Sequence, residues 1–353
     1  MTRLTRRQFS TIAGASALLA LSPLGSRSGR AQDKALVKIT AAEAVETLYY
    51  LPLYVAHALG FFKEQGLDVT IFNAQQRTIA LRAIVNGDAF TYNGDPAEPA
   101  LARQLGQKVK NFGVIVNRAG GAILGKKGID KDPKKWAGKR IITPRPPHTS
   151  VSLVQMVLQN NGYEKADKDG LAFKPKGGSD KDAVNLTPVL AGAELSALAA
   201  GQAELSIVLE PSIAIGVAQG FDHITSFADQ FGPFFYTSFA VTEESIEKRP
   251  EQVQAFANAM QKAYLFGHKY PDRAAEVAVK RYDTQDSKIV AAAARNIIRD
   301  KAYPESLLVT KEAYEKNFNQ LLVATGHPAA KFPMNELMDN RFAEKAAATI
   351  KNV

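Results

Sequence analysis

The sequence contains no cysteine, and its 353 residues include only one tryptophan and five histidines. Without cysteine the chain can form no disulfide, no thiolate zinc site and no cysteine nucleophile, and it cannot carry a lipid on an N-terminal cysteine. The histidines are not paired at the spacing of metal ligands, so we expect neither a metal nor a cofactor. The absence of cysteine is compatible with an oxidising compartment but does not identify one.

Motifs of common enzyme classes are missing as well. There is no Gly-x-Ser-x-Gly elbow, no His-Glu-x-x-His pair and no Walker phosphate loop. No segment after the N-terminal region reaches the length of a membrane-spanning helix. Hydrophobic residues make up 46% of the chain and charged residues 22%, which is typical of a globular rather than a disordered protein. We therefore expect a soluble mature chain that is not an enzyme.

The excess of positive charge is concentrated at the N-terminus. The formal net charge is +9, and the first 31 residues contain no acid but five arginines, without which the charge falls to +4: Arg3, Arg6, Arg7, Arg27 and Arg30. The other basic residues are interspersed with acids and form no block with aromatic residues. The charge therefore does not predict a nucleic-acid partner.

Residues 1–31 have the three parts of an export signal. A charged segment, Thr5–Phe9, precedes the apolar stretch Ile12–Leu21, and small residues lead to a plausible cleavage site at Ala31. The apolar stretch is too short to span a membrane. The pair Arg6-Arg7 resembles a twin-arginine signal, which would make the Tat export machinery a partner. An ordinary Sec signal that holds two arginines is the alternative, and either predicts export to the periplasm.

From Leu36 onward, short apolar runs alternate with helical patterns, which indicates parallel strands covered by helices. The predicted strands are 37–41, 67–72, 89–92, 109–116, 123–126, 140–143, 171–174, 205–209 and 236–241. The predicted helices before Pro250 are 52–62, 79–85, 96–105, 149–160 and 188–200. After Pro250 the pattern is helical to the end, and one apolar face includes Val253, Phe256 and Met260.

This order predicts two α/β lobes joined by two crossings. Residues 36–122 and 237–353 would form the first lobe, and residues 123–236 the second. Clefts between lobes are favoured sites for small molecules, and two crossings allow a hinge to close around a ligand. We expect the ligand site in that cleft.

Five stretches resemble, in order, motifs of one family. The most specific is Leu53–Val69, which is similar to a P-x-Y-V-A-x-x-x-G-F-F-x-x-x-G-L-x-V pattern. Weaker matches follow at Asp88–Pro96, Trp136–Ile141, Leu190–Pro211 and Met338–Phe342. The family is the NMT1/THI5-like group of sulfonate-, nitrate-, taurine- and thiamine-pyrimidine-precursor-binding proteins of ABC importers. The resemblance covers roughly residues 36–345.

The resemblance implies a type II periplasmic binding-protein fold with a ligand cleft between two α/β lobes. It also implies a small-molecule solute and an ABC permease as partners, and we expect a monomer. Two stretches depart from the family pattern: residues 143–150 replace a Gly-Ser-Ser-rich loop, and Leu209 stands where the family has tryptophan before Glu-Pro. Both lie where the family contacts its ligands, so the solute is not predicted.

The first group of candidate binding residues surrounds the start of the predicted helix 149–160. The resemblance places ligand contacts at His148, Thr149 and Ser150, and the free N–H groups of a helix N-terminus suit an anion. The alternative is that Thr149 or Ser150 only caps the helix. Arg145 could bind a sulfonate or carboxylate, or could be a solvated loop residue.

The second group lies at predicted strand ends, which face the ligand crevice in α/β folds. Gly94 would allow close approach of the backbone to a ligand, and Asp95 is either a helix cap or an acceptor for a ligand amine. Glu210 could contact the ligand or pin the lobe through a salt bridge. Arg118 lies near the first crossing.

The third group is aromatic. Tyr49, Tyr50 and Tyr54 lie where the first strand leads into the first helix, and Tyr236 lies near the second crossing. Their rings could hold a planar or aliphatic group, or could only cover the core.

The function predicted from these residues is capture of a small polar solute, taurine-like or a nitrogen heterocycle, for an importer. A periplasmic sensor module that reports to a receptor or kinase is an alternative with the same closure. A pyrimidine-precursor enzyme is a third; relatives of that kind use a cysteine-rich motif, which this chain lacks.

Overall fold

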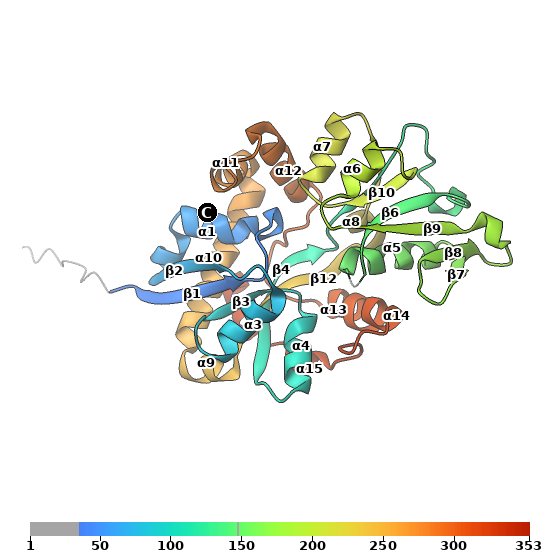
Figure 1. The fold of residues 1–353 in the computed structure, drawn as a ribbon. Helices are drawn as coiled ribbons and strands as arrows, with labels where there is room; N and C mark the ends of the chain where they lie inside the picture. The colour runs from blue at the N-terminus through green and yellow to red at the C-terminus, as the bar shows by residue number, and fades with distance from the viewer. Residues whose placement is uncertain (1–34, 147) are drawn as a thin grey trace, which may run out of the picture. The chain divides into compact units, whose positions relative to one another are not determined.

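The computed structural model describes residues 35–146 and 148–353 (Figure 1). The predicted export signal, residues 1–31, lies outside this part of the chain. Residues 36–353 form one unit that contains two β-sheets. Within the described residues, no helix combines the length and the apolar character that a membrane span requires.

The first sheet has five strands in the order β2-β1-β3-β12-β4. Their bounds are β1 Val37–Glu43, β2 Leu67–Asn73, β3 Thr91–Gly94, β4 Val109–Arg118 and β12 Pro233–Thr242. β1 runs parallel to β2 and β3, as predicted, but β12 is antiparallel to both β3 and β4. The strand–helix alternation did not predict the direction of β12, which enters the sheet from the opposite end on its return from the second sheet.

The second sheet has seven strands in the order β11-β5-β10-β6-β9-β8-β7. Their bounds are β5 Ala122–Gly125, β6 Arg140–Pro144, β7 Tyr163–Lys165, β8 Ala172–Pro175, β9 Val184–Val189, β10 Leu205–Val208 and β11 Asp222–Ser226. Only the central pairs β10/β6 and β6/β9 are parallel, whereas the outer pairs are antiparallel. This sheet is therefore mixed.

The chain passes between the sheets twice. The first passage is the short segment between β4 and β5, and the second leads from β11 through α8, Phe227–Phe231, into β12. The two passages lie together, because Pro233 at the start of β12 pairs with Arg118 at the end of β4. The lobe limits given above stay predictions; β12 begins before the predicted limit at residue 237.

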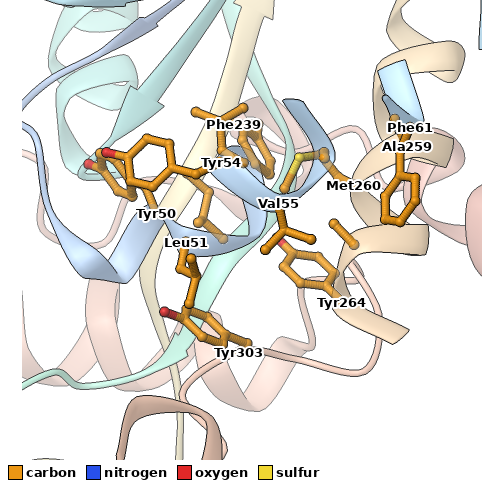
Figure 2. Packing of buried hydrophobic residues seen from close by; sticks show 14 of the residues in the cluster. Tyr50, Leu51, Tyr54, Val55, Phe61, Phe239, Ala259, Met260, Tyr264 and Tyr303 are labelled. Atoms are coloured by element: carbon orange, nitrogen blue, oxygen red, sulfur yellow. The ribbon is translucent and has the colours of Figure 1, made fainter. Parts of the chain in front are cut away.

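Helices on both sides of the first sheet bury its faces. The predicted apolar face after Pro250 is confirmed, because Val253, Phe256 and Met260 of α10 (Pro250–Lys269) are fully buried. They share a core with α1 (Leu51–Ala58) and with Phe239 of β12, which Figure 2 shows from close by. Phe239 and Phe256 pack edge to face with their centroids 5.3 Å apart, which stabilises aromatic pairs beyond their burial.

A separate core fills the second lobe. It includes the only tryptophan, Trp136, whose ring nitrogen donates to the carbonyl of Asp130 at 2.8 Å. The buried face of α5 (Thr149–Asn160) packs into the same core through Leu153 and Val157. The limits of α5 agree with the helix predicted from the sequence.

Other elements differ from the sequence prediction. The single helix expected over 52–62 is broken at Gly60, whose φ of 78° ends α1 before α2 (Phe61–Glu64) begins. The helix expected over 188–200 is shorter, α6 (Glu194–Ala199), because Pro188 belongs to β9, where it pairs with Thr143 of β6. The strands β7, β9 and β11 were not predicted.

The remaining helices before α10 are η1 Leu48–Tyr50, α3 Arg77–Val85, α4 Ala97–Gln104, η2 Pro133–Lys135, η3 Asp180–Asp182, α7 Ser212–Ala218 and α9 Glu243–Lys248. Those after α10 are α11 Pro271–Arg281, α12 Ser287–Arg299, α13 Lys311–Glu315, the π-helix η4 Lys316–Leu321, α14 Leu322–Ala324, α15 Met334–Leu337 and α16 Arg341–Thr349.

Candidate functional site

A cavity of about 190 Å³, here called the inner chamber, lies between the carboxyl ends of β1 and β3 and the start of α5. Its lining residues from the first lobe are Ala44, Val45, Thr47, Tyr49, Tyr50, Arg77 and Asp95, with Tyr236 and Thr237 from β12. His148, Thr149 and Leu209 line it from the second lobe. The chamber is therefore walled by both lobes, as the sequence predicts for a ligand cleft.

A larger cavity of about 570 Å³, here called the outer chamber, adjoins the inner one. Five residues line both chambers and mark their junction: Arg77, Asp95, His148, Thr149 and Tyr236. The outer chamber extends between α5 and the segment that follows α14 and ends at Pro328. Its size falls within the usual range of small-molecule pockets, about 300–1,000 Å³. The two chambers together form one cleft between the lobes.

The aromatic wall of the inner chamber is held by η1. The Thr47 side chain caps this turn by accepting from the Tyr49 N–H at 3.3 Å, and the Tyr303 hydroxyl donates to the Leu48 carbonyl at 2.6 Å. The Tyr49 hydroxyl accepts from the Gly121 N–H at 2.9 Å, which ties η1 to the first passage between the sheets. The position of Tyr49 is therefore fixed by contacts within the first lobe and with the first passage between the sheets.

The cation of the junction is Arg77, the first residue of α3. Its Nη1 lies 3.3 Å from Oδ2 of Asp95, and 45% of the Arg77 side chain is exposed. Asp95 also caps the start of α4, since its Oδ1 accepts from the Ala97 N–H at 2.9 Å. Asp95 thus has the capping role that the sequence offered, and it also lines the cleft; its role as an acceptor for a ligand amine stays a prediction. The guanidinium has five N–H donors, so one contact with Asp95 leaves donors for a ligand.

His148 caps α5 from the second lobe. Its Nδ1 accepts from the Ser150 N–H at 3.3 Å and lies 2.7 Å from the Ser150 Oγ. Burial, with the nearby Arg77 guanidinium, lowers the pKa of His148, so the ring is neutral at pH 7. Because Nδ1 accepts from the backbone, we assign the hydrogen to Nε2, which is then a donor.

Six of the predicted residues line the cleft, and six do not. Those that line it are Tyr49, Tyr50, Asp95, His148, Thr149 and Tyr236. Ser150 lies next to them but is only 1% exposed, and its side chain faces His148. The cap of α5 is His148, so neither Thr149 nor Ser150 has the capping role that the sequence left open as the alternative.

Three predicted residues near the cleft have structural contacts instead. The Tyr54 hydroxyl donates to Oε2 of Glu43 at 2.8 Å, behind the chamber wall. A Cβ at Gly94 would collide with the hydroxyl of Tyr92 and lie 3.1 Å from Cβ of Ala44, so this glycine allows side-chain packing rather than ligand approach. Arg118 donates to the Ala228 carbonyl at 3.3 Å and so braces the two passages.

Arg145 and Glu210 are also separate from the lining. Arg145 is exposed. The Glu210 carboxylate is buried, where Oε1 accepts from Nδ2 of Asn296 at 2.9 Å and Oε2 from the Ala214 N–H at 3.1 Å. Asn296 belongs to α12, so Glu210 links the lobes, although through a neutral amide and not through the salt bridge considered above.

Sequence reasoning missed Arg77. It placed the start of the helix at Ile79, where the apolar pattern begins, whereas α3 begins at Arg77. The signal that could have found it is position: a basic residue at the start of a helix is unfavourable for the helix dipole, so it calls for another role. Thr237 and the segment Ala44–Thr47 carried no comparable signal.

Comparison with known proteins shows the family of this chain. The NMT1/THI5-like family model matches residues 47–274. The chain belongs to the NMT1/THI5-like family. A Bacillus subtilis protein that carries the name of a binding protein, YtlA, is 23% identical over 322 residues, which cover 90% of this chain and 92% of YtlA.

Two solved structures are similar to this member of the family. The periplasmic aliphatic sulphonate binding protein SsuA from Escherichia coli has a TM-score of 0.64 at 10% identity, over 86% of this chain and 91% of SsuA. The desulfurization enzyme DSZB has a TM-score of 0.59 at 14% identity, over 89% and 100%. At these identities the structural similarity shows the fold alone. It confirms the predicted two-lobe periplasmic binding-protein fold. One of the two similar structures is a binding protein and the other is an enzyme.

Proposed function

We propose that this chain is the periplasmic substrate-binding subunit of an ABC importer and that it captures a small organic anion in the cleft without altering it. One observation carries the proposal: Arg77 of one lobe and the start of α5 in the other lobe line the same junction. The names of YtlA and SsuA, which are binding proteins, support the same function class.

The junction favours an anion. Among the residues that the structure describes, Arg77 is the only arginine or lysine that lines the inner chamber, and it contacts Asp95 through a single 3.3 Å pair. A carboxylate or sulfonate could take up the remaining guanidinium donors, with the Thr149 hydroxyl and His148 as further donors from the second lobe. Ligand contacts that come from both lobes would stabilise the closed form over the open one. In this proposal the anion contacts both lobes and so stabilises the closed form.

A ligand amine is less well supported. The sequence offered Asp95 and Glu210 as acceptors for an amine, but Asp95 is paired with Arg77 and Glu210 is committed to Asn296 and Ala214. An organic sulfonate therefore fits the cleft better than an aminopyrimidine does. The other parts of the proposal come from the sequence: twin-arginine export, a monomer, and an inner-membrane permease as the partner of the closed form.

The test is calorimetric titration of the purified protein with methanesulfonate, taurine, benzenesulfonate, benzoate, nitrate and 4-aminopyrimidine. We expect at least one organic anion to bind. Replacing Arg77→Ala should then weaken that anion by about 10- to 150-fold, because a hydrogen bond to a charged group contributes about 1.5–3 kcal/mol.

Arg145→Ala is the matched control, since this arginine is exposed and lies outside the lining of both chambers. Its affinity should stay within about twofold of the parent protein. The proposal would be contradicted if no anion bound measurably, or if Arg77→Ala and Arg145→Ala lost affinity for the anion to the same extent.

A further inference from the structure

The inner chamber is polar at its junction and uncharged in its depth. In the described part of the chain, the charged residues that line it are Arg77 and Asp95, and both also line the outer chamber, as does the titratable His148. The residues that line the inner chamber alone are uncharged: Ala44, Val45, Thr47, Tyr49, Tyr50, Leu209 and Thr237. A solute bound at the junction therefore faces only uncharged residues on the side of the inner chamber.

Two tyrosines of this wall, Tyr49 and Tyr50, and Tyr236 at the junction give the inner chamber three aromatic rings. The rings of Tyr49 and Tyr236 meet edge to face, with centroids 6.2 Å apart and planes at 70°, and Tyr50 completes the lining. Burial raises the pKa of Tyr236 to about 12 and raises that of Tyr50 further, so the phenols stay neutral at pH 7. Tyrosine rings present large apolar area together with a hydroxyl that can donate a hydrogen bond.

The wall is also held rigidly. The Tyr49 hydroxyl accepts from the Gly121 N–H, and a Cβ at Gly120 would lie only 2.7 Å from Cζ of Tyr49, so this ring packs directly on the first passage. Tyr50 is 2% exposed and joins the core of α1 and α10; in Figure 2 its hydroxyl points away from Met260. A preorganised wall loses little conformational entropy when a ligand binds.

Two hydroxyls of this wall are available to a ligand. Within residues 35–146 and 148–353, neither the Tyr50 nor the Tyr236 hydroxyl has a hydrogen-bond partner. Tyr236 lines both chambers, and Tyr50 lines the inner chamber together with Arg77 and Asp95. The rings thus offer their apolar parts to the chamber and their donors to the anion site.

We infer that the solute is an aryl acid, with its aromatic ring in the inner chamber and its carboxylate or sulfonate at Arg77 and Thr149. This inference rests on the proposed function and narrows its substrate class. The chamber of about 190 Å³ accepts a single ring, and the outer chamber accommodates a further substituent. Leu209, the residue that replaces the family's tryptophan, supplies an aliphatic wall from the second lobe.

The experiment compares matched acids by calorimetric titration of the purified protein. Benzenesulfonate is set against cyclohexanesulfonate and methanesulfonate, and benzoate against cyclohexanecarboxylate. Aromatic contacts are strong enough to predict that the planar acid binds about tenfold tighter than its saturated partner. If methanesulfonate or the cyclohexyl acids bind as tightly as the aryl acids, the inference is overturned while the importer function stands. If none of these five acids binds, the inference is overturned, and if taurine and nitrate also fail to bind, the proposed function is contradicted as well.

Variants locate the ring. Tyr50→Leu should reduce the preference for the aryl acid to about twofold or less and leave methanesulfonate binding within about twofold, whereas Tyr50→Phe should keep most of the preference. Tyr236→Leu, at a half-buried position on the cleft, provides the same test if the Tyr50→Leu protein does not fold. An unchanged aryl preference in a folded leucine variant would refute the placement of the ring.

Discussion

Glu43 provides the sharpest prediction about stability. It is the last residue of β1, directly before the chamber wall at Ala44, and its side chain has no exposed surface. The Tyr54 hydroxyl donates to it at 2.8 Å, and Nη2 of Arg281 lies 3.5 Å away. Burial nevertheless dominates, and the pKa of Glu43 rises from 4.5 to about 7.

The sign of the pH dependence follows from this direction. A carboxyl whose folded-state pKa lies above its unfolded value contributes stability that is complete below about pH 4.5 and is lost as the pH rises through about 7. Each unit of pKa difference corresponds to about 1.36 kcal/mol, so the term from Glu43 declines by about 2.5 kcal/mol between pH 5 and pH 8. Other titrating groups add to the measured curve, and a variant is needed to isolate this one.

Glu43→Gln removes the titration and keeps an acceptor for Tyr54. We expect the difference in unfolding free energy between this variant and the parent to shift by about 2.5 kcal/mol in favour of the variant between pH 5 and pH 8. Urea denaturation followed by circular dichroism at four pH values measures it. Glu305→Gln, at an exposed glutamate, is the control and should track the parent at each pH. A Glu43→Gln difference that is constant within about 0.5 kcal/mol over this range would refute the reasoning.

Two further predictions concern Gly120, in the first passage between the sheets, and Glu210, which contacts α12. Gly120→Ala should destabilise the fold by about 1–3 kcal/mol and weaken ligand binding, because the new Cβ would lie 2.7 Å from Cζ of the fixed Tyr49. Gly267→Ala is the control and should be neutral or stabilising, since a Cβ there would have no atom within 4 Å. Urea denaturation and calorimetric titration of the two variants measure the difference. Glu210→Ala should lower the unfolding free energy by about 1–3 kcal/mol, since it leaves the Asn296 amide without its acceptor, while the affinity for the anion stays within about threefold. If Glu210→Ala greatly weakened anion binding without lowering the unfolding free energy, Glu210 would instead belong to the binding site.

Several parts of the cleft could be predicted before the structure was known. The strand ends at Asp95 and the start of the helix at Thr149 both line the junction, because proline, glycine and apolar periodicity mark where elements begin and end. The parallel pairing of β1 with β2 and β3 followed from strand–helix alternation. These are local signals, and a single sequence carries them.

Side-chain direction was not predictable in the same way. Tyr49, Tyr50 and Tyr54 look equivalent in the sequence, yet the first two line the chamber while Tyr54 binds Glu43 behind it. Glu210 follows a buried strand as a ligand residue would, but Asn296 from α12, 86 residues later, takes its carboxylate. Each outcome depends on which distant element packs against the residue.

The sequence by itself determined that this chain builds two α/β lobes, and it located most of the segments that meet in the cleft, because both follow from local patterning and from motifs in order. Only the tertiary structure decided that β12 returns antiparallel, that Arg77 and not Arg145 lines the inner chamber, and that Glu210 is a link between lobes. The physical reason is that a buried polar group takes whichever partner the packing of remote segments brings within hydrogen-bond distance, and no local pattern records that partner.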